Sequence, residues 1–114
     1  SNMRPPGPWN PPRGIQEHVE RACELIHKEL RDKKANLIIY GSCVRGASTP
    51  ADIDIAIDSK KPISSSKIKK LEAALKHSEI PYPVDLVDLS TASSALRSVI
   101  EKHGVSWSPR TASA

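Results

Sequence analysis

The sequence contains no apolar run near the roughly 18 residues that a membrane-spanning helix requires. No secretory signal is recognisable, and we interpret residues 1–3 as the remnant of an expression tag. The two cysteines, Cys23 and Cys43, and the four histidines have none of the spacings typical of a metal site or a disulfide framework. These absences exclude the membrane-spanning and disulfide-rich secreted classes, and we expect a cytoplasmic protein.

The chain is too short, at 114 residues, for more than one ordinary domain. Prolines are concentrated near its start, at positions 5, 6, 8, 11 and 12. Because proline fixes φ and removes a donor, we expect residues 1–14 to form an extended or disordered arm, followed by a domain over 15–108 and a loose tail over 109–114. Trp9 in that arm is interpreted as an anchor on the domain or, alternatively, as a contact for a partner.

The net charge of +4 favours a polyanionic ligand such as a nucleoside triphosphate. It is too small to predict DNA or RNA binding, and the lysines are dispersed along the sequence rather than clustered.

Hydrophobic periodicity predicts alternating helices and strands. Helices are expected over residues 15–34, after the serines at 64–66, and up to Gly104 with Ser90 or Thr91 as its cap. Strands are expected over residues 37–40, 52–58 and 84–89, and residues 41–51 form a loop that can hold one helical turn. The order α-β-(α)-β-α-β-α predicts an α/β domain with a single small sheet flanked by helices.

Asp52 and Asp54 open the second predicted strand and point to the same side, because side chains alternate along a strand. Two such carboxylates can converge on Mg²⁺, which prefers oxygen ligands shared with phosphates. Asp85 lies in the third strand between apolar residues, and a third carboxylate would complete a metal clamp for an in-line displacement.

Gly41 and Ser42 follow the first predicted strand. A turn of this kind can present backbone N–H groups to a phosphate, and glycine permits close approach. Arg45 can add a charged contact to a phosphate oxygen. Each feature alone is weak, because most Gly-Ser pairs are turns and most Asp-x-Asp pairs are solvated. Their combination is specific.

That combination, from Gly41-Ser42 through Asp52-Ile53-Asp54 to Asp85, resembles the signature of the DNA polymerase β-type nucleotidyltransferase superfamily, and most closely its minimal nucleotidyltransferases. The resemblance implies a small mixed sheet with helices. It also implies that Gly41 and Ser42 bind the nucleotide, to which the charge of Arg45 adds a predicted contact, while Asp52, Asp54 and Asp85 are catalytic and bind Mg²⁺. Many members are antitoxins paired with a small helical HEPN protein, and the active ones transfer AMP from ATP to a tyrosine of that toxin.

The sequence departs from this pattern at two positions, since Cys43 stands where a basic residue is frequent and Ala51 where serine is frequent. Both departures weaken the implied phosphate contacts and leave the acids intact. Asp88 is a rival to Asp85 as the third acid, and we prefer Asp85 because it comes first in the hydrophobic-flanked motif, as the third acid of that family does.

The predicted function is therefore Mg²⁺-dependent transfer of a nucleoside monophosphate, AMP from ATP by resemblance, to a protein hydroxyl of a HEPN-type partner. The alternative is a nucleotide-binding module that neutralises a partner by complex formation, with catalysis weak or lost. A homodimer is a further possibility for a domain this small. A phosphatase-like or glycosyltransferase-like Asp-x-Asp is disfavoured, because here the pair opens its strand and a Gly-Ser precedes it.

Overall fold

The computed structural model describes residues 3–4, 14–32, 34–44 and 52–109. Along the chain the elements are β1 (Met3–Arg4), α1 (Ile15–Leu30), β2 (Asn36–Tyr40), β3 (Ile53–Asp58), α2 (Ser65–Lys76), β4 (Val84–Asp88), the 3₁₀ turn η1 (Leu89–Thr91), α3 (Ser94–His103) and β5 (Val105–Trp107). None of the helices in these ranges is both long and apolar enough to cross a membrane. The expected α/β class is confirmed.

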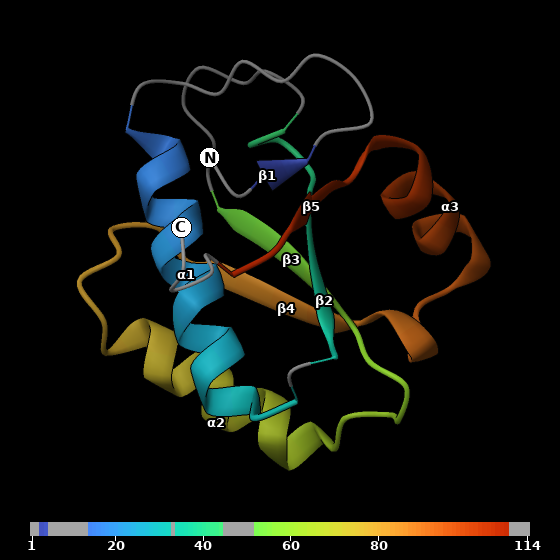
Figure 1. Ribbon diagram of the computed structural model, residues 1–114, viewed down its shortest axis with the longest axis horizontal. Helices are drawn as coiled ribbons and strands as arrows, with labels where there is room; N and C mark the ends of the chain where they lie inside the picture. The colour runs from blue at the N-terminus through green and yellow to red at the C-terminus, as the bar shows by residue number, and fades with distance from the viewer. Residues whose placement is uncertain (1–2, 5–13, 33, 45–51, 110–114) are drawn as a thin grey trace.

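All five strands belong to one mixed sheet, in the order β1-β5-β2-β3-β4. Only β3 and β4 run parallel, and α2 is the helical crossover that connects them. The other neighbours pair antiparallel. Figure 1 shows α1 and α2 on one face of the sheet and α3 on the other. This topology brings the end of β2 beside the beginnings of β3 and β4.

The alternation predicted for β3 is confirmed by its packing. Ile53, Ile55 and Ile57 are buried in the main core, which they share with residues of α1 and α2. Ala56 packs instead in a second cluster with Leu89 and with Ile100 of α3. Because side chains alternate along a strand, even-numbered residues of β3 face the α3 side.

Two predicted helix limits were wrong. The first helix was expected to continue to residue 34, but it ends at Leu30 because Arg31 adopts a left-handed conformation, with φ of 60°. The last helix was expected to be capped by Ser90 or Thr91. Those residues form η1 instead, and the hydroxyl of Ser93 caps α3 by accepting from the backbone N–H of Leu96 at 3.2 Å.

The short strand β5 was not predicted. Its three residues are too few to show a period, and their extended conformation depends on pairing with the distant β2, where Leu37 faces Trp107. The β1 strand, within the predicted arm, pairs with the other edge of β5. The remainder of that arm, with Trp9, lies outside the described residues, as does the possible helical turn within 45–51.

Asp88 connects the end of β4 to the loop before α2. Its Oδ2 accepts from the backbone N–H of Ile63 at 2.8 Å, and its Oδ1 accepts from the backbone N–H and the hydroxyl of Ser90 at 3.0 and 2.8 Å. Burial alone would raise the pKa of Asp88, but these hydrogen bonds outweigh it and hold the pKa below its ordinary value of 3.8. The carboxylate is therefore a structural acceptor.

We expect Asp88→Asn to lower the free energy of unfolding by about 1–3 kcal/mol, because one buried donor loses its acceptor. Asp58→Asn is the matched control, since Asp58 is exposed at the end of β3. Urea denaturation of the two variants checks this. An Asp88→Asn midpoint equal to that of the control would contradict the structural role.

The pH dependence of stability follows from the same shift. Because the folded-state pKa of Asp88 is below its unfolded value, its contribution is fully present above the unfolded pKa near 3.8 and is lost as pH falls through the folded value. Acid denaturation below about pH 4 should therefore be less steep in Asp88→Asn than in the wild type. Equal slopes would contradict this assignment.

Candidate active site

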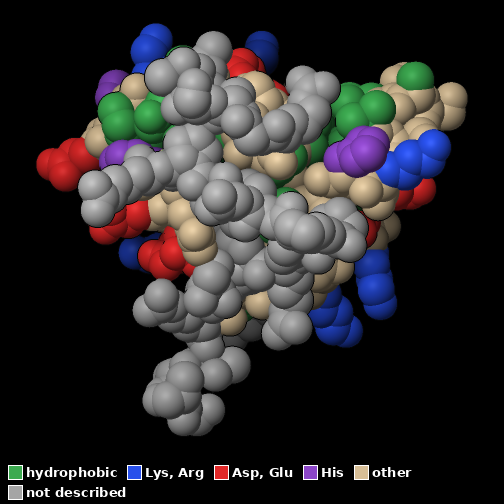
Figure 2. All heavy atoms as spheres, turned by 90° about the horizontal axis from the view of Figure 1, so that it is seen from above, with side chains coloured by type: hydrophobic (Ala, Val, Ile, Leu, Met, Phe, Trp, Pro, Cys, Tyr) green, Lys and Arg blue, Asp and Glu red, His purple; other side chains and the backbone are tan. Residues whose placement is uncertain are grey.

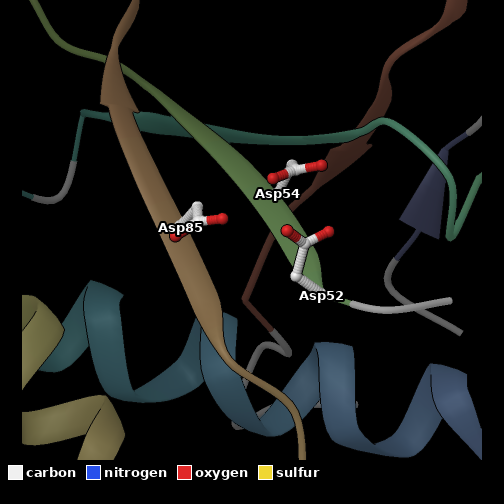
Figure 3. A group of neighbouring side chains, drawn as sticks. All are labelled: Asp52, Asp54 and Asp85. Carbon is white, nitrogen blue, oxygen red and sulfur yellow. The ribbon is translucent and has the colours of Figure 1, made fainter.

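Three carboxylates from two neighbouring strands converge at one end of the sheet. Asp52 precedes β3 directly, Asp54 is the second residue of β3, and Asp85 is the second residue of β4. Asp54 and Asp85 are register partners in the parallel pair. One carboxylate oxygen from each of the three lies within 4.8 Å of the others. Figure 3 shows the three side chains pointing toward a common space.

Gly41 lies against this group from the β2 side. Gly41 directly follows β2 and has a φ of +83°. A Cβ at this position would overlap Oδ2 of Asp54. The backbone N–H of Val44 donates to the Gly41 carbonyl at 3.2 Å, which closes the turn that contains Ser42. The predicted proximity of the glycine turn and the aspartate pair is thus a feature of the structure. Arg45, the third predicted nucleotide-binding residue, lies outside the described residues.

Gly41→Ala should lower any activity of this site by at least about tenfold, because the new methyl group must displace the Asp54 carboxylate. The control is Gly14→Ala. Gly14 also has a positive φ, of +87°, but no atom lies within 4 Å of its Cβ position. Both variants should therefore lose about 1–3 kcal/mol of stability through backbone strain, and only Gly41→Ala should lose function. Activity assays paired with thermal melts test this, and equal activity in the two variants would be inconsistent with it.

The carboxylates influence one another in the absence of a cation. The pKa of Asp85 is raised above its ordinary value of 3.8 by partial desolvation, by a hydrogen bond with Asp52 and by the negative charges of Asp52 and Glu72. A hydrogen bond between two carboxyl groups requires that one of them keep a proton. A divalent cation would remove this repulsion, and the all-oxygen donor set fits Mg²⁺ or a similar hard ion.

Two side chains beside the group were not predicted from the sequence. Tyr40 is the register partner of Asp54 on β2, and its pKa is raised by burial and by the charges of Asp54, Asp85 and Asp52. Glu72 of α2 is close enough for its charge to act on Asp85. For Tyr40, the only sequence signal is its place just before Gly41. No sequence signal pairs Glu72 with β4, because their contact depends on how α2 packs.

Two other candidates have structural roles. Asp88 does not belong to the group, since it caps η1 and accepts from the loop before α2. Cys43, which replaces a frequent basic residue, is fully buried in the main core, and burial raises its pKa to about 11. Its thiol donates to the carbonyl of Tyr40 at 3.7 Å, and with its raised pKa it is not a nucleophile. Ala51 lies outside the described residues.

Figure 2 shows how the described basic side chains are distributed on one face of the molecule. On the face in Figure 2, the described lysine and arginine side chains are spread around the periphery rather than gathered into one patch. A nucleic-acid-binding domain typically gathers such residues on one face or along a helix.

A mixed sheet that presents three convergent carboxylates beside a glycine turn is typical of nucleotidyl-transfer proteins, and the carboxylates suggest a site for a divalent metal. Residues 24–107 match the family described as Polymerase beta, Nucleotidyltransferase. That match covers most of the chain, and the chain belongs to this family.

Individual relatives agree with this assignment. The chain is 38% identical over 64 residues to the "Probable protein adenylyltransferase MntA" of Haemophilus influenzae, over 55% of this chain and 56% of that protein. It therefore spans little more than half the length of this curated relative.

Two solved structures share the fold. One is described as the tri-AMPylated Shewanella oneidensis HEPN toxin in complex with MNT antitoxin, with a TM-score of 0.65, 25% identity and coverage of 82% of this chain and 72% of that chain. Another is described as a toxin-antitoxin with AMP-PNP, with a TM-score of 0.62, 30% identity and coverage of 76% and 73%. The predicted mixed sheet and family are confirmed.

Proposed function

We propose that this chain is a Mg²⁺-dependent nucleotidyltransferase that transfers AMP from ATP to a hydroxyl group of a small helical HEPN-type protein, which it thereby neutralises as an antitoxin. The observation that supports this most is the convergence of Asp52, Asp54 and Asp85 within 4.8 Å, directly beside Gly41. The names of the adenylyltransferase relative and of the HEPN complex support AMP as the transferred group and a HEPN-type acceptor.

The proposed roles follow from a row of three register partners that crosses the sheet. Tyr40, Asp54 and Asp85 are register partners on β2, β3 and β4, and the Gly41 turn adjoins the β2 end of that row. Backbone N–H groups of the Gly41–Ser42 turn would bind the β- and γ-phosphates, with Arg45 as an added charge. Asp52, Asp54 and Asp85 would hold Mg²⁺, which when bound neutralises charge on the triphosphate and on the attacking oxygen.

In the proposed reaction, the acceptor hydroxyl oxygen forms a bond to the α-phosphorus while the bond from that phosphorus to the bridging oxygen breaks. Pyrophosphate leaves toward Gly41, and Asp85, the register partner of Asp54, would accept the hydroxyl proton. Tyr40 would contribute a partly buried wall beside Asp54, which limits water near the carboxylates.

The test is to purify the chain with the protein encoded by the neighbouring gene, add ATP and Mg²⁺, and measure the intact mass of both proteins. We expect the partner to gain one or more AMP units. A stable complex whose partner keeps its mass at high ATP would replace this proposal with the binding-module alternative. The absence of a complex would contradict the partner assignment.

A further inference from the structure

A pocket with a largely apolar lining opens at the edge strand β4, on the α2 side of the sheet. Its volume is about 430 Å³, and it is lined by Glu72, Leu75 and Lys76 of α2 and by residues 80–84. Ile80 and Leu75 form its buried apolar floor. Pro81, Tyr82 and Pro83 give it a wall with few backbone donors, because proline has none. Such a pocket suits an apolar or aromatic side chain.

The lining of the pocket is adjacent in sequence to the acidic group. Val84 lines the pocket, and the next residue, Asp85, belongs to the three converging carboxylates. Glu72 lies on the pocket rim and also acts by its charge on Asp85. The carbonyl of Pro83 accepts from the N–H of Ile53 at 2.9 Å, so the pocket wall is fixed to the strand that carries the aspartate pair.

The ring of Tyr82 packs against a residue of α1. This ring lies 5.7 Å from the ring of His18 of α1, at an interplanar angle of 57°. Tyr82 also packs against the main core. The wall is therefore preorganised, which lowers the entropic cost of binding a side chain against it.

The in-line geometry of the proposed reaction places the acceptor on this side. Pyrophosphate leaves toward the Gly41 turn at the β2 end of the row, so the attacking oxygen must approach from the opposite end, beyond Asp54 toward Asp85. Among the described residues the sheet ends at β4, so a partner segment can approach there without displacing a strand.

The geometry points to this pocket as the acceptor subsite: it binds an apolar or aromatic side chain of the partner protein that is a close sequence neighbour of the modified hydroxyl residue. This inference rests on the proposed function. Successive residues of β4 face opposite sides of the sheet, with Asp85 toward the carboxylate group and Val84 toward the pocket. An extended acceptor segment alternates in the same way, so its hydroxyl and its anchoring side chain are adjacent in sequence.

The pocket can be blocked by labelling a single introduced cysteine. The two cysteines of the chain, Cys23 and Cys43, are buried, and their pKa values are raised by burial, so neither competes for thiol reagents. Lys76→Cys places one accessible thiol on the pocket rim. Lys70→Cys is the control, because Lys70 is exposed on the same helix and lines a different hollow. A bulky aromatic methanethiosulfonate forms a disulfide with either thiol, and a reductant removes it.

The experiment measures AMP transfer to the purified HEPN-type protein of the neighbouring gene, before labelling, after labelling and after reduction. We expect labelled Lys76→Cys to raise the KM for the partner at least about tenfold, with reversal on reduction, while the KM for ATP changes less than about twofold. Labelled Lys70→Cys should change neither. Equal KM values for the partner in the two labelled variants would overturn the acceptor subsite and leave the proposed function standing.

Two further outcomes are distinguishable. A raised KM for ATP with an unchanged KM for the partner would show that the nucleotide occupies the pocket, which contradicts the acceptor assignment. The absence of transfer by the wild-type chain and by both unlabelled variants would overturn the proposed function and this inference together.

Discussion

Asp54→Asn should abolish AMP transfer while leaving the fold intact. Asp54 lies at the centre of the row between Tyr40 and Asp85, and its carboxylate is one of the three that lie within 4.8 Å. Replacing it with a neutral amide weakens the metal site, whose charge stabilisation is worth several kcal/mol in enzymes of this chemistry. Since each 1.36 kcal/mol is a tenfold change, we expect a loss of at least about 10³-fold in kcat/KM.

Stability should not fall in this variant, because the substitution removes repulsion among like charges. Asp58→Asn is the matched control, since Asp58 is on the same face of the same strand but lies at its exposed far end. Transfer rates and thermal melts of both variants separate function from folding. Activity within tenfold of the wild type in Asp54→Asn would contradict the metal role of the group.

Removal of divalent cations should have an effect of similar size. We expect EDTA to reduce transfer to the background rate and added Mg²⁺ to restore it, because without a cation the three carboxylates repel the negatively charged triphosphate.

A second readout does not depend on turnover. Mn²⁺ together with a non-cleavable ATP analogue should raise the melting temperature of the wild type by mass action, and the same mixture should leave Asp54→Asn unshifted. Transfer that persists in excess EDTA would show that the carboxylates act without a metal.

The sequence predicted the parts of the fold that local patterns determine. Strict alternation from Asp52 to Asp58 predicted which side of β3 enters the core, and the packing of its isoleucines confirms it. The serine cap of α2 was also expected, and the Ser64 hydroxyl accepts from the N–H of Lys67 at 3.1 Å. Such features depend only on residues a few positions apart.

Other parts depend on distant contacts and were missed. β5 is extended because β2 supplies its hydrogen-bonding partner, and nothing within its three residues indicates that pairing. The end of α1 is set by the left-handed Arg31, although no glycine marks that position. Local periodicity cannot show either feature.

The candidate site also contains both features that local spacing predicts and features that depend on the fold. Asp52 and Asp54 were expected on one face from their spacing, and the preference for Asp85 over Asp88 rested on a resemblance. The structure gives that preference a physical basis, since Asp85 is the register partner of Asp54 while the Asp88 carboxylate is occupied by Ile63 and Ser90. Their roles in binding and catalysis remain predictions.

The apolar pocket could not be predicted from the sequence. It requires the end of α2 and residues 80–84 to come together at the edge of β4. The Pro81-Tyr82-Pro83 sequence indicated only that α2 stops there. Its proximity to Asp85 appears once the parallel β3–β4 pair and its crossover helix are in place.

The most direct test of the central claim is anomalous diffraction from crystals grown with Mn²⁺ and an ATP analogue whose α–β bridge cannot be cleaved. We expect Mn²⁺ coordinated directly by Asp52 and Asp54, with Asp85 completing the group and the terminal phosphates of the analogue on the Gly41–Ser42 turn. Mn²⁺ bound elsewhere with the three carboxylates uncoordinated, or a triphosphate bound away from Gly41, would contradict it.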